Sequence, residues 1–329
     1  MNRFSAAGFG LTLLAAVSAT AAPTLYTGEI AVMRVSGTYC ASDVYERLPQ
    51  IDLVLDRSGD GTVTGFYSIE GVKVGKLSGP SPDRLSVEYP IADPARSKGH
   101  TLSLDLAKDP VSGILQEKGL AEKAEGCAIE VGEVRLSPVP DEDAADWFKR
   151  TEKSYQAQAL SSEALSFMKK DQPAKAIPLY REALALEEAA QGAGSPLSIL
   201  YVDQLANAYG KSRQPDQGIA LLEPRVEQSQ DPEKRFYSEA LARLLQMKGA
   251  TFSREGRYSE ALPVYRRAMT LDPSESDYPA GLARTLIKLN RIEEAAALLD
   301  EVTPLFTEEN DREELNRVRR ELKAAKKKP

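Results

Sequence analysis

The side chains with the most obvious chemistry are two cysteines, Cys40 and Cys127, and a single histidine, His100. The cysteines form no C-x-x-C motif and neither has the histidine beside it, so their spacing favours a disulfide over a redox centre or a metal site. That bond would close a loop of roughly ninety residues, for which loop-closure entropy gives an upper figure of about 4–5 kcal/mol. A catalytic triad through His100 lacks a G-x-S-x-G elbow, and we expect this histidine on the surface.

One acidic turn has oxygen ligands at the spacing that calcium uses. Asp56, Ser58, Asp60 and Gly61 match the first half of an EF-hand loop. That loop should close with a glutamate, and Tyr67 stands there instead. Alternating apolar residues, typical of strands, flank the turn. The sequence therefore favours a β-hairpin with an Asp-Gly turn, with a calcium site as the alternative.

The first residues predict export. Arg3 is followed by an apolar or small-residue stretch over 4–17, and residues 18–21 (SATA) offer an A-x-A cleavage site. These are the parts of a secretory signal peptide, which we assign to residues 1–21. The expected location is periplasmic or secreted. No other stretch is long and apolar enough for a transmembrane helix, so stable membrane insertion is not expected.

The composition limits the class of partner. The chain has 42 basic and 49 acidic residues in 329, a formal net charge of −7. Nucleic acid attracts clustered lysine and arginine, so this balance argues against it. The length predicts about two domains. The basic run Lys326–Lys328 is interpreted as a solvated tail, with a weak contact to anionic lipid or glycan as the alternative.

Residues 26–137 are predicted to form an antiparallel β domain. Leu102, Leu104 and Leu106 alternate with Ser103 and Asp105, the period of two that marks a strand with one buried face. Turn signals separate about eight such runs, which favours a small barrel or sandwich. Residues 138–145, with two prolines and then acidic residues, are predicted as a linker that leads into a helix.

The C-terminal half carries small and bulky residues at fixed offsets that recur four times. This pattern predicts two closely packed helices in each unit, and such units must stack to bury their apolar faces. The small residues are Ala164, Ala176, Ala206, Gly218, Gly249, Ala261, Ala283 and Ala295, and the bulky ones are Phe167, Tyr180, Tyr209, Leu222, Phe252, Tyr265, Leu286 and Leu299.

The unit around residues 249–273 resembles a tetratricopeptide repeat, with its small residue, aromatic residues, alanines and final Pro273 in the family's order. The resemblance implies four helical units over residues 146–305, of which the second and fourth are degenerate. Residues 306–329 are predicted as a capping helix and basic tail. Steps of 42, 43 and 34 residues separate the four equivalent residues Ala176, Gly218, Ala261 and Ala295. We expect longer helices or connections in the first two steps, near residues 191–196 and 228–232.

In this family the partner usually lies in a concave groove lined by the first helices, and the resemblance places eight residues there. Four of the five basic residues among them occupy the same place in each unit, near the end of its first helix: Lys169, Lys211, Arg254 and Lys288. The alternative for these four is that they only complement the helix dipole. The set does not reproduce the full carboxylate clamp of some family members. It comprises Lys169, Asp203, Asn207, Lys211, Gln246, Arg254, Arg284 and Lys288.

These patterns predict an α+β protein of two domains that works as a protein–protein interaction scaffold in the cell envelope, without a cofactor. Its groove would bind an acidic polypeptide segment, or one with a free C-terminal carboxylate. One alternative is a small-ligand-binding barrel whose repeats mediate assembly. A second is an envelope enzyme without a recognisable motif. The oligomeric state is left open.

Overall fold

The computed structural model describes residues 22–36, 49–97, 99–116, 128–140 and 143–326. The predicted signal peptide, Cys40, Cys127 and Lys327–Lys328 lie outside these ranges, so the disulfide and the cleavage site stay predictions. The chain divides into two compact units. The first takes in nearly all strand residues and the first helix up to Phe148. The second takes in the rest of that helix, the other helices and the segments Gly71–Val74 and Tyr89–Ser97.

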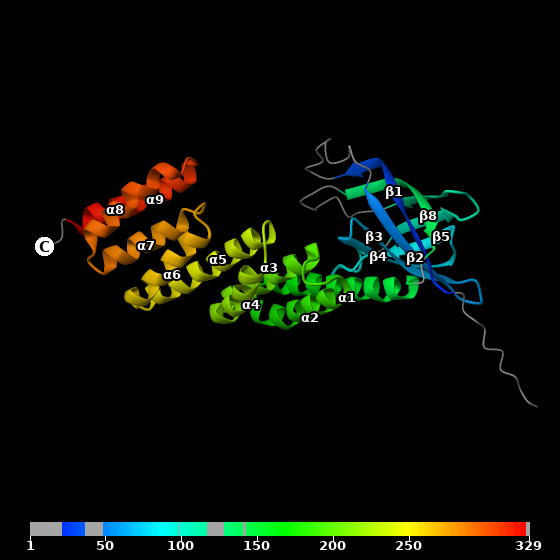
Figure 1. Cartoon of the computed structure of the whole chain (residues 1–329), viewed down its shortest axis with the longest axis horizontal. Helices are drawn as coiled ribbons and strands as arrows, with labels where there is room; N and C mark the ends of the chain where they lie inside the picture. Colours follow the sequence, from blue (N-terminus) through cyan, green and yellow to red (C-terminus); the bar gives the residue numbers. More distant parts are fainter. Residues whose placement is uncertain (1–21, 37–48, 98, 117–127, 141–142, 327–329) are drawn as a thin grey trace, which may run out of the picture. The chain divides into compact units, whose positions relative to one another are not determined.

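The first unit is a closed antiparallel barrel in which each strand pairs with its neighbour in the chain and the last pairs with the first (Figure 1). Closure removes the exposed strand edges that a sandwich would keep. The fold is thus a barrel, one of the two predicted architectures. Its strands are β1 Thr24–Ser36, β2 Gln50–Arg57, β3 Val63–Ile69, β4 Lys73–Ser81, β5 Arg84–Glu88, β6 His100–Asp105, β7 Val111–Gln116 and β8 Ala128–Val139.

Large apolar side chains fill the barrel interior. The predicted alternation is confirmed on β6, where Leu102 and Leu104 are buried while Ser103 and Asp105 are exposed. Tyr67 on β3 is fully buried, and a Cβ on Gly75 of the next strand would lie 2.4 Å from its ring. That glycine therefore gives Tyr67 its room.

His100 was predicted to lie on the surface. It is instead buried, with 1% of its area exposed. It is the first residue of β6, whose burial alternates from its first position. The alternation therefore starts two residues before Leu102, where the sequence analysis began it, and turns His100 inward with Leu102 and Leu104.

The β pattern also runs further than predicted. β8 continues to Val139, and Pro138 lies opposite Tyr26 of β1. The next helix begins at Ala144, so strand and helix both extend into the span 138–145 predicted as linker. Phe148 packs edge-on against Phe66 of β3 with 5.1 Å between ring centroids.

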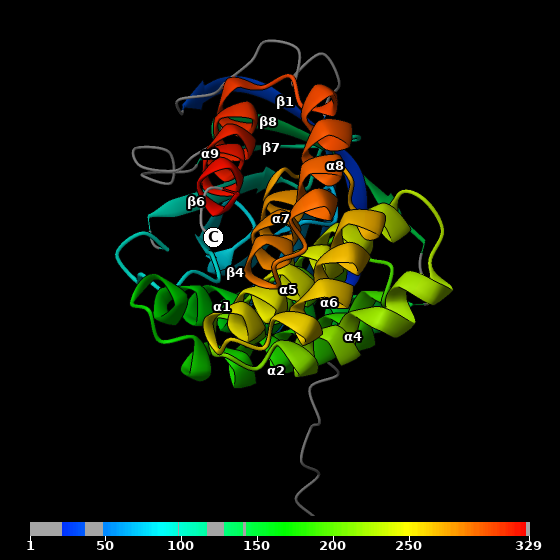
Figure 2. The same cartoon turned by 90° about the vertical axis from the view of Figure 1, so that its left-hand side faces the viewer.

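The second unit is an array of antiparallel helix pairs, with one further helix packed against the last pair (Figures 1 and 2). Small residues at the helix contacts are buried as predicted: Ala164, Ala176, Ala206, Ala261, Ala283 and Ala295 expose 2% of their area or less. The helices are α1 Ala144–Lys169, α2 Pro173–Gln191, α3 Pro196–Lys211, α4 Pro215–Gln228, α5 Glu233–Arg254, α6 Tyr258–Leu271, α7 Asp277–Lys288, α8 Ile292–Val302 and α9 Glu309–Ala325, with a short 3-10 turn at Thr303–Leu305.

The turn inside each helix pair is built the same way four times. A residue of positive φ follows each first helix: Asp171, Arg213, Gly256 and Asn290. One residue further on, a backbone N–H donates to the carbonyl of the predicted bulky residue, as Arg257 does to Phe252 at 2.8 Å. This is the Schellman pattern that satisfies the last carbonyls of a helix. The predicted left-handed Gly256 is confirmed.

The uneven steps come from longer helices, not longer connections. The connections Gly192–Ser195 and Ser229–Pro232 each have four residues, no more than the five between α6 and α7. In contrast α5 has 22 residues and α7 has 12, which accounts for the longer second step. Residues 191–196 and 228–232 are therefore not the sites of extension. Two to three added helical turns lengthen the surface that α5 presents.

Two short segments belong with the helices of the second unit although they follow strands in the chain. The side-chain amide of Gln158 on α1 donates to the carbonyl of Val72 at 3.0 Å. Four residues along the same face, Ser162 Oγ accepts from the backbone N–H of Ala92 at 2.8 Å. Polar side chains on one face of α1 therefore hydrogen-bond to the peptide backbone of both segments. In the described part of the chain no helix combines the length and apolarity that crossing a membrane requires.

Candidate functional site

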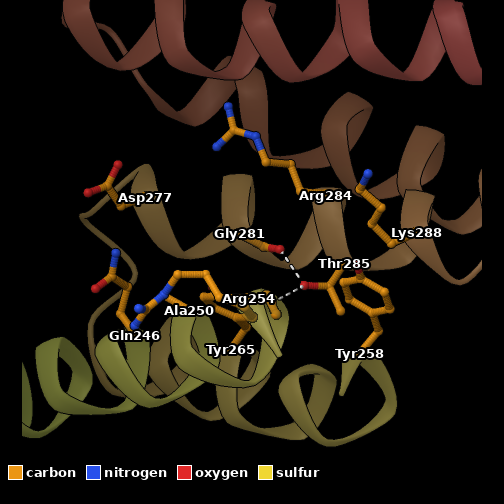
Figure 3. Close-up of a pocket in the computed structure, with 11 residues that line it drawn as sticks. Gln246, Ala250, Arg254, Tyr258, Tyr265, Asp277, Gly281, Arg284, Thr285 and Lys288 are labelled. Atoms are coloured by element: carbon orange, nitrogen blue, oxygen red, sulfur yellow. Dashed lines mark hydrogen bonds between the residues drawn. The ribbon is translucent and has the colours of Figure 1, made fainter. Parts of the chain in front are cut away.

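A pocket of about 360 Å³ opens between α5 and α7, with the second helix α6 behind it (Figure 3). Four of the eight predicted groove residues line it: Gln246 and Arg254 from α5, and Arg284 and Lys288 from α7. The sequence prediction thus brings half of its residues to one place. The other lining residues are Ala250, Ser253, Tyr258, Tyr265, Asp277, Gly281 and Thr285.

Small residues let the three helices approach closely around one buried tyrosine. A Cβ on Gly281 of α7 would lie 2.4 Å from the ring of Tyr265, and one on Gly249 of α5 would lie 3.0 Å from it. Tyr265 is 5% exposed, and this burial raises the pKa of its hydroxyl. The ring therefore fixes the distance between α5 and α7 and forms the back of the pocket.

A short hydrogen-bond chain joins the two first helices inside the pocket. Thr285 Oγ1 on α7 donates to the carbonyl of Gly281 at 2.8 Å. Its oxygen lies 3.3 Å from Ser253 Oγ on α5 and accepts from that hydroxyl when its own proton is donated to Gly281 (Figure 3). These bonds hold the polar wall of the pocket without using a charged side chain, so the cations around it stay available.

Arg284 points away from the pocket floor towards the C-terminal helix (Figure 3). Its guanidinium lies 2.8 Å from Glu314 and 3.1 Å from Glu321, both on α9. Burial acts to lower the pKa of Arg284, but the hydrogen bonds to these two glutamates outweigh it, so the pKa is raised. Arg284 therefore meets two carboxylates before any ligand arrives.

Arg254 and Lys288 differ from Arg284 in this respect. Among the described residues neither has a carboxylate within ion-pair distance, and Arg254 only donates to Thr251 Oγ1 at 2.9 Å. Two arginines on second helices, in contrast, are paired: Arg225 reaches Glu188 at 2.8 Å and Arg267 reaches Glu223 at 2.6 Å. Two unpaired cations beside one hollow make a site for an anionic group.

The remaining predicted residues do not join this pocket. Asp203 of α3 forms an ion pair with Arg243 of α5. Asn207 and Lys211 on α3 and Lys169 on α1 are exposed. None of these four residues lines the α5–α7 pocket, so the predicted row of eight residues divides into two sets.

The alternative role predicted for the basic residues applies to all four of them. Lys169, Lys211, Arg254 and Lys288 are each the last residue of a first helix. A cation there complements the partial negative charge of the helix end, typically by 0.3–1 kcal/mol. This effect does not distinguish the four from one another. The pocket does, since it takes only Arg254 and Lys288.

Two residues of the pocket, one from the second helix and one from a helix start, were not predicted from the sequence. Tyr258 opens α6 and Asp277 opens α7. The repeat register assigned only first-helix positions to the groove. A signal was present in the turn at residues 255–257, since a turn this short brings the first residue of α6 back beside the last residue of α5.

The acidic turn between β2 and β3 is a hairpin turn, as favoured from the sequence. Thr62 donates its backbone N–H to Asp60 Oδ1 at 2.9 Å, and Ser58 donates its hydroxyl to the same carboxylate. These hydrogen bonds, first that from Ser58, lower the pKa of Asp60 to about 2. Among the described residues there is no group of three His, Cys, Asp or Glu side chains placed to hold a metal ion.

Fold and pocket together define a β-barrel followed by helical repeats with a polar groove site. The family model of the tetratricopeptide repeat matches residues 253–315, which confirms the resemblance for the C-terminal part. Repeats of this family generally bind other proteins or peptides and are generally not catalytic. No curated protein matches the chain.

Solved structures similar to the chain include nearly identical TPR-like repeats from Podosopora anserina, described as those of a putative kinesin light chain. One is 20% identical, with a TM-score of 0.37, and the match covers 53% of this chain and 92% of that one. A variant of the same repeats that carries one substitution is 18% identical, with a TM-score of 0.36, and the match covers 53% of this chain and 96% of that one.

Proposed function

We propose that this protein is a non-enzymatic interaction scaffold whose α5–α7 pocket binds an acidic part of a polypeptide partner. One observation carries the proposal: Arg254 and Lys288 line the same pocket and have no carboxylate partner among the described residues. Elsewhere in the array, arginines such as Arg225 and Arg267 are already paired.

The pocket suits side chains of a partner better than a whole secondary-structure element. Its volume of about 360 Å³ is at the lower end of small-molecule sites. Tyr258 adds an aromatic surface beside the cations, and Gln246 adds an amide that both donates and accepts. An acidic side chain with its neighbouring peptide group matches this combination of charge, apolar surface and hydrogen bonding.

We further propose that the chain is exported and acts in the cell envelope. The support is the pattern of Arg3, the apolar stretch over 4–17 and the A-x-A site before residue 22. N-terminal sequencing of the protein from its native host tests this. A start near residue 22 is expected, and a start at Met1 in the cytosolic fraction would contradict it.

The barrel is proposed as a docking module and not as a ligand carrier. A carrier needs interior space lined by apolar groups. In the described strands the inward positions hold large side chains that expose 2% of their area or less, including Tyr67, Leu53, Leu102 and Leu104. In the described part of the barrel, this packing supports a docking role over the alternative of a small-ligand barrel.

The test uses a fluorescently labelled hexaglutamate peptide and its hexaglutamine counterpart, with anisotropy as the readout. The hexaglutamate peptide is expected to bind, and Arg254→Glu with Lys288→Glu should weaken binding at least about tenfold, since charge-assisted bonds are lost and repulsion is added. Lys169→Glu with Lys211→Glu makes the same change in net charge away from the pocket. Equal weakening by both pairs, or no binding by the unaltered protein, would refute the pocket as the site.

A further inference from the structure

The C-terminal helix places two carboxylates on a cation of the binding pocket. Glu314 and Glu321 lie seven residues apart on α9, hence on one face, and both reach Arg284. Glu314 also reaches Arg317 on its own helix at 2.8 Å, which holds its carboxylate in place. One of the three cations of the pocket, Arg284, is therefore already in ion pairs with acidic side chains of the same chain.

The helix that carries these glutamates is firmly packed. Leu315 and Val318 expose none of their area and Leu322 exposes 7%, all in one apolar cluster with α7 and α8. Because burial of three apolar side chains stabilises the packed helix more than a surface ion pair does, lifting the whole helix would cost several times the free energy of one such ion pair. A partner therefore reaches Arg284 by displacing the glutamate side chains and not the helix that carries them.

We propose that Glu314 and Glu321 compete in cis with the acidic partner for Arg284 and so set the affinity of the pocket. This inference rests on the proposed function. A partner binds first through Arg254 and Lys288, which have no carboxylate of their own among the described residues. It gains Arg284 only when it displaces the two glutamates, so the pocket favours partners with several closely spaced carboxylates over those with one.

The decisive variant removes the competing charges and keeps the shape: Glu314→Gln with Glu321→Gln. Freed from two half-exposed ion pairs, Arg284 should tighten binding of the labelled hexaglutamate peptide by roughly three- to tenfold. The matched control is Glu309→Gln with Glu313→Gln, which alters two exposed glutamates of the same helix that have no ion pair among the described residues. It makes the same change in net charge and should shift binding less than about twofold.

A third variant separates competition from general electrostatics. Arg284→Gln should weaken binding less in the unaltered protein than in the Glu314→Gln, Glu321→Gln variant, because the two glutamates already pair with this cation in the unaltered protein. Combined with Glu314→Gln and Glu321→Gln it should abolish the gain. A gain that persists without Arg284, an equal gain in the control pair, or no gain at all would overturn the inference. Thermal unfolding of each variant shows whether α9 remains packed.

The same measurements keep the two proposals apart. If Arg254→Glu with Lys288→Glu abolishes binding but the α9 variant does not tighten it, the pocket function stands and the cis competition falls. If the unaltered protein and the α9 variant both fail to bind the peptide, the pocket function itself falls. Tightening in the α9 variant that also depends on Arg254 supports both.

Discussion

The barrel and the helical array use their residues in opposite ways. In the barrel, the strands pair in a closed circuit and the inward side chains pack against one another. These side chains are therefore buried in the core and do not face a ligand. In the array, packing takes up the small residues between helices and leaves the ends of the first helices free. The proposed recognition residues Arg254 and Lys288 thus lie where packing makes no demand on the side chain.

The units also differ in how a local change should spread. Barrel strands pair with partners around the whole circuit, whereas each helix contacts chiefly its neighbours in sequence. The stability of a solenoid is therefore approximately a sum of the stabilities of its units and of the interfaces between them. A closed barrel instead loses all its strand pairing in one cooperative transition. The following changes test this difference, from the largest expected effect to the smallest.

The largest effect is expected from Leu53→Ala in the barrel. Leu53 exposes none of its area, and truncation of such a residue costs about 2–5 kcal/mol because it leaves a cavity. Trp147, the single tryptophan, belongs to the barrel unit, so its fluorescence follows that unit, while far-UV circular dichroism follows the helices. The fluorescence transition should move to lower denaturant and the helical transition should not. A shared shift would show that the units unfold as one.

Next is Gly281→Ala, which should weaken the contact between the last two helix pairs. The added methyl would lie 2.4 Å from the ring of Tyr265, and overpacking of this kind costs about 1–3 kcal/mol. Gly194→Ala is the control, because a Cβ there meets nothing within 4 Å. Hydrogen exchange should quicken in α6 to α9 and stay unchanged in the barrel strands. Equal protection in both variants would contradict a tight Tyr265 contact.

The sequence predicted most of the fold because regular packing leaves regular spacing. Small residues such as Gly249 and Ala261 recur where helices touch, and the alternation of Leu102 and Leu104 marks a strand. It predicted Gln246, Arg254, Arg284 and Lys288 for the pocket through the same register. It missed the carboxylates of Glu314 and Glu321, since a contact between helices outside the repeat follows no period. It also placed His100 outside, because a polar residue two positions before Leu102, the first apolar residue of the strand, does not extend the apolar alternation.

A smaller effect should come from the left-handed residues of the turns. Arg213 has a φ of 62°, a conformation that costs a residue with a Cβ about 1–2 kcal/mol. Arg213→Gly should therefore stabilise the array, by less than about 1 kcal/mol after the added freedom of the unfolded chain is subtracted. Gly256→Ala, at the equivalent place with a φ of 76°, should destabilise it by a similar amount. Denaturant midpoints followed by circular dichroism measure both, and changes of the same sign would refute the equivalence of the turns.

The smallest effect concerns acid and the barrel. Hydrogen bonds from Ser58 and Thr62 lower the folded pKa of Asp60 from 3.8 to about 2. The unfolded chain then binds this proton first as the pH falls, so the stabilisation is complete above about pH 4 and is lost between about pH 4 and pH 2. Asp60→Asn should flatten that part of the tryptophan-fluorescence stability profile and leave the circular dichroism profile of the helices unchanged. Because Asp60 is exposed, the change is small, and Asp83→Asn provides a second exposed acid of lowered pKa on the same barrel. If Asp60→Asn instead changed the circular dichroism profile of the helices, the stability of the array would depend on this barrel carboxylate. The contrast between a hydrogen-bonded barrel turn and an ion-paired array would then be wrong.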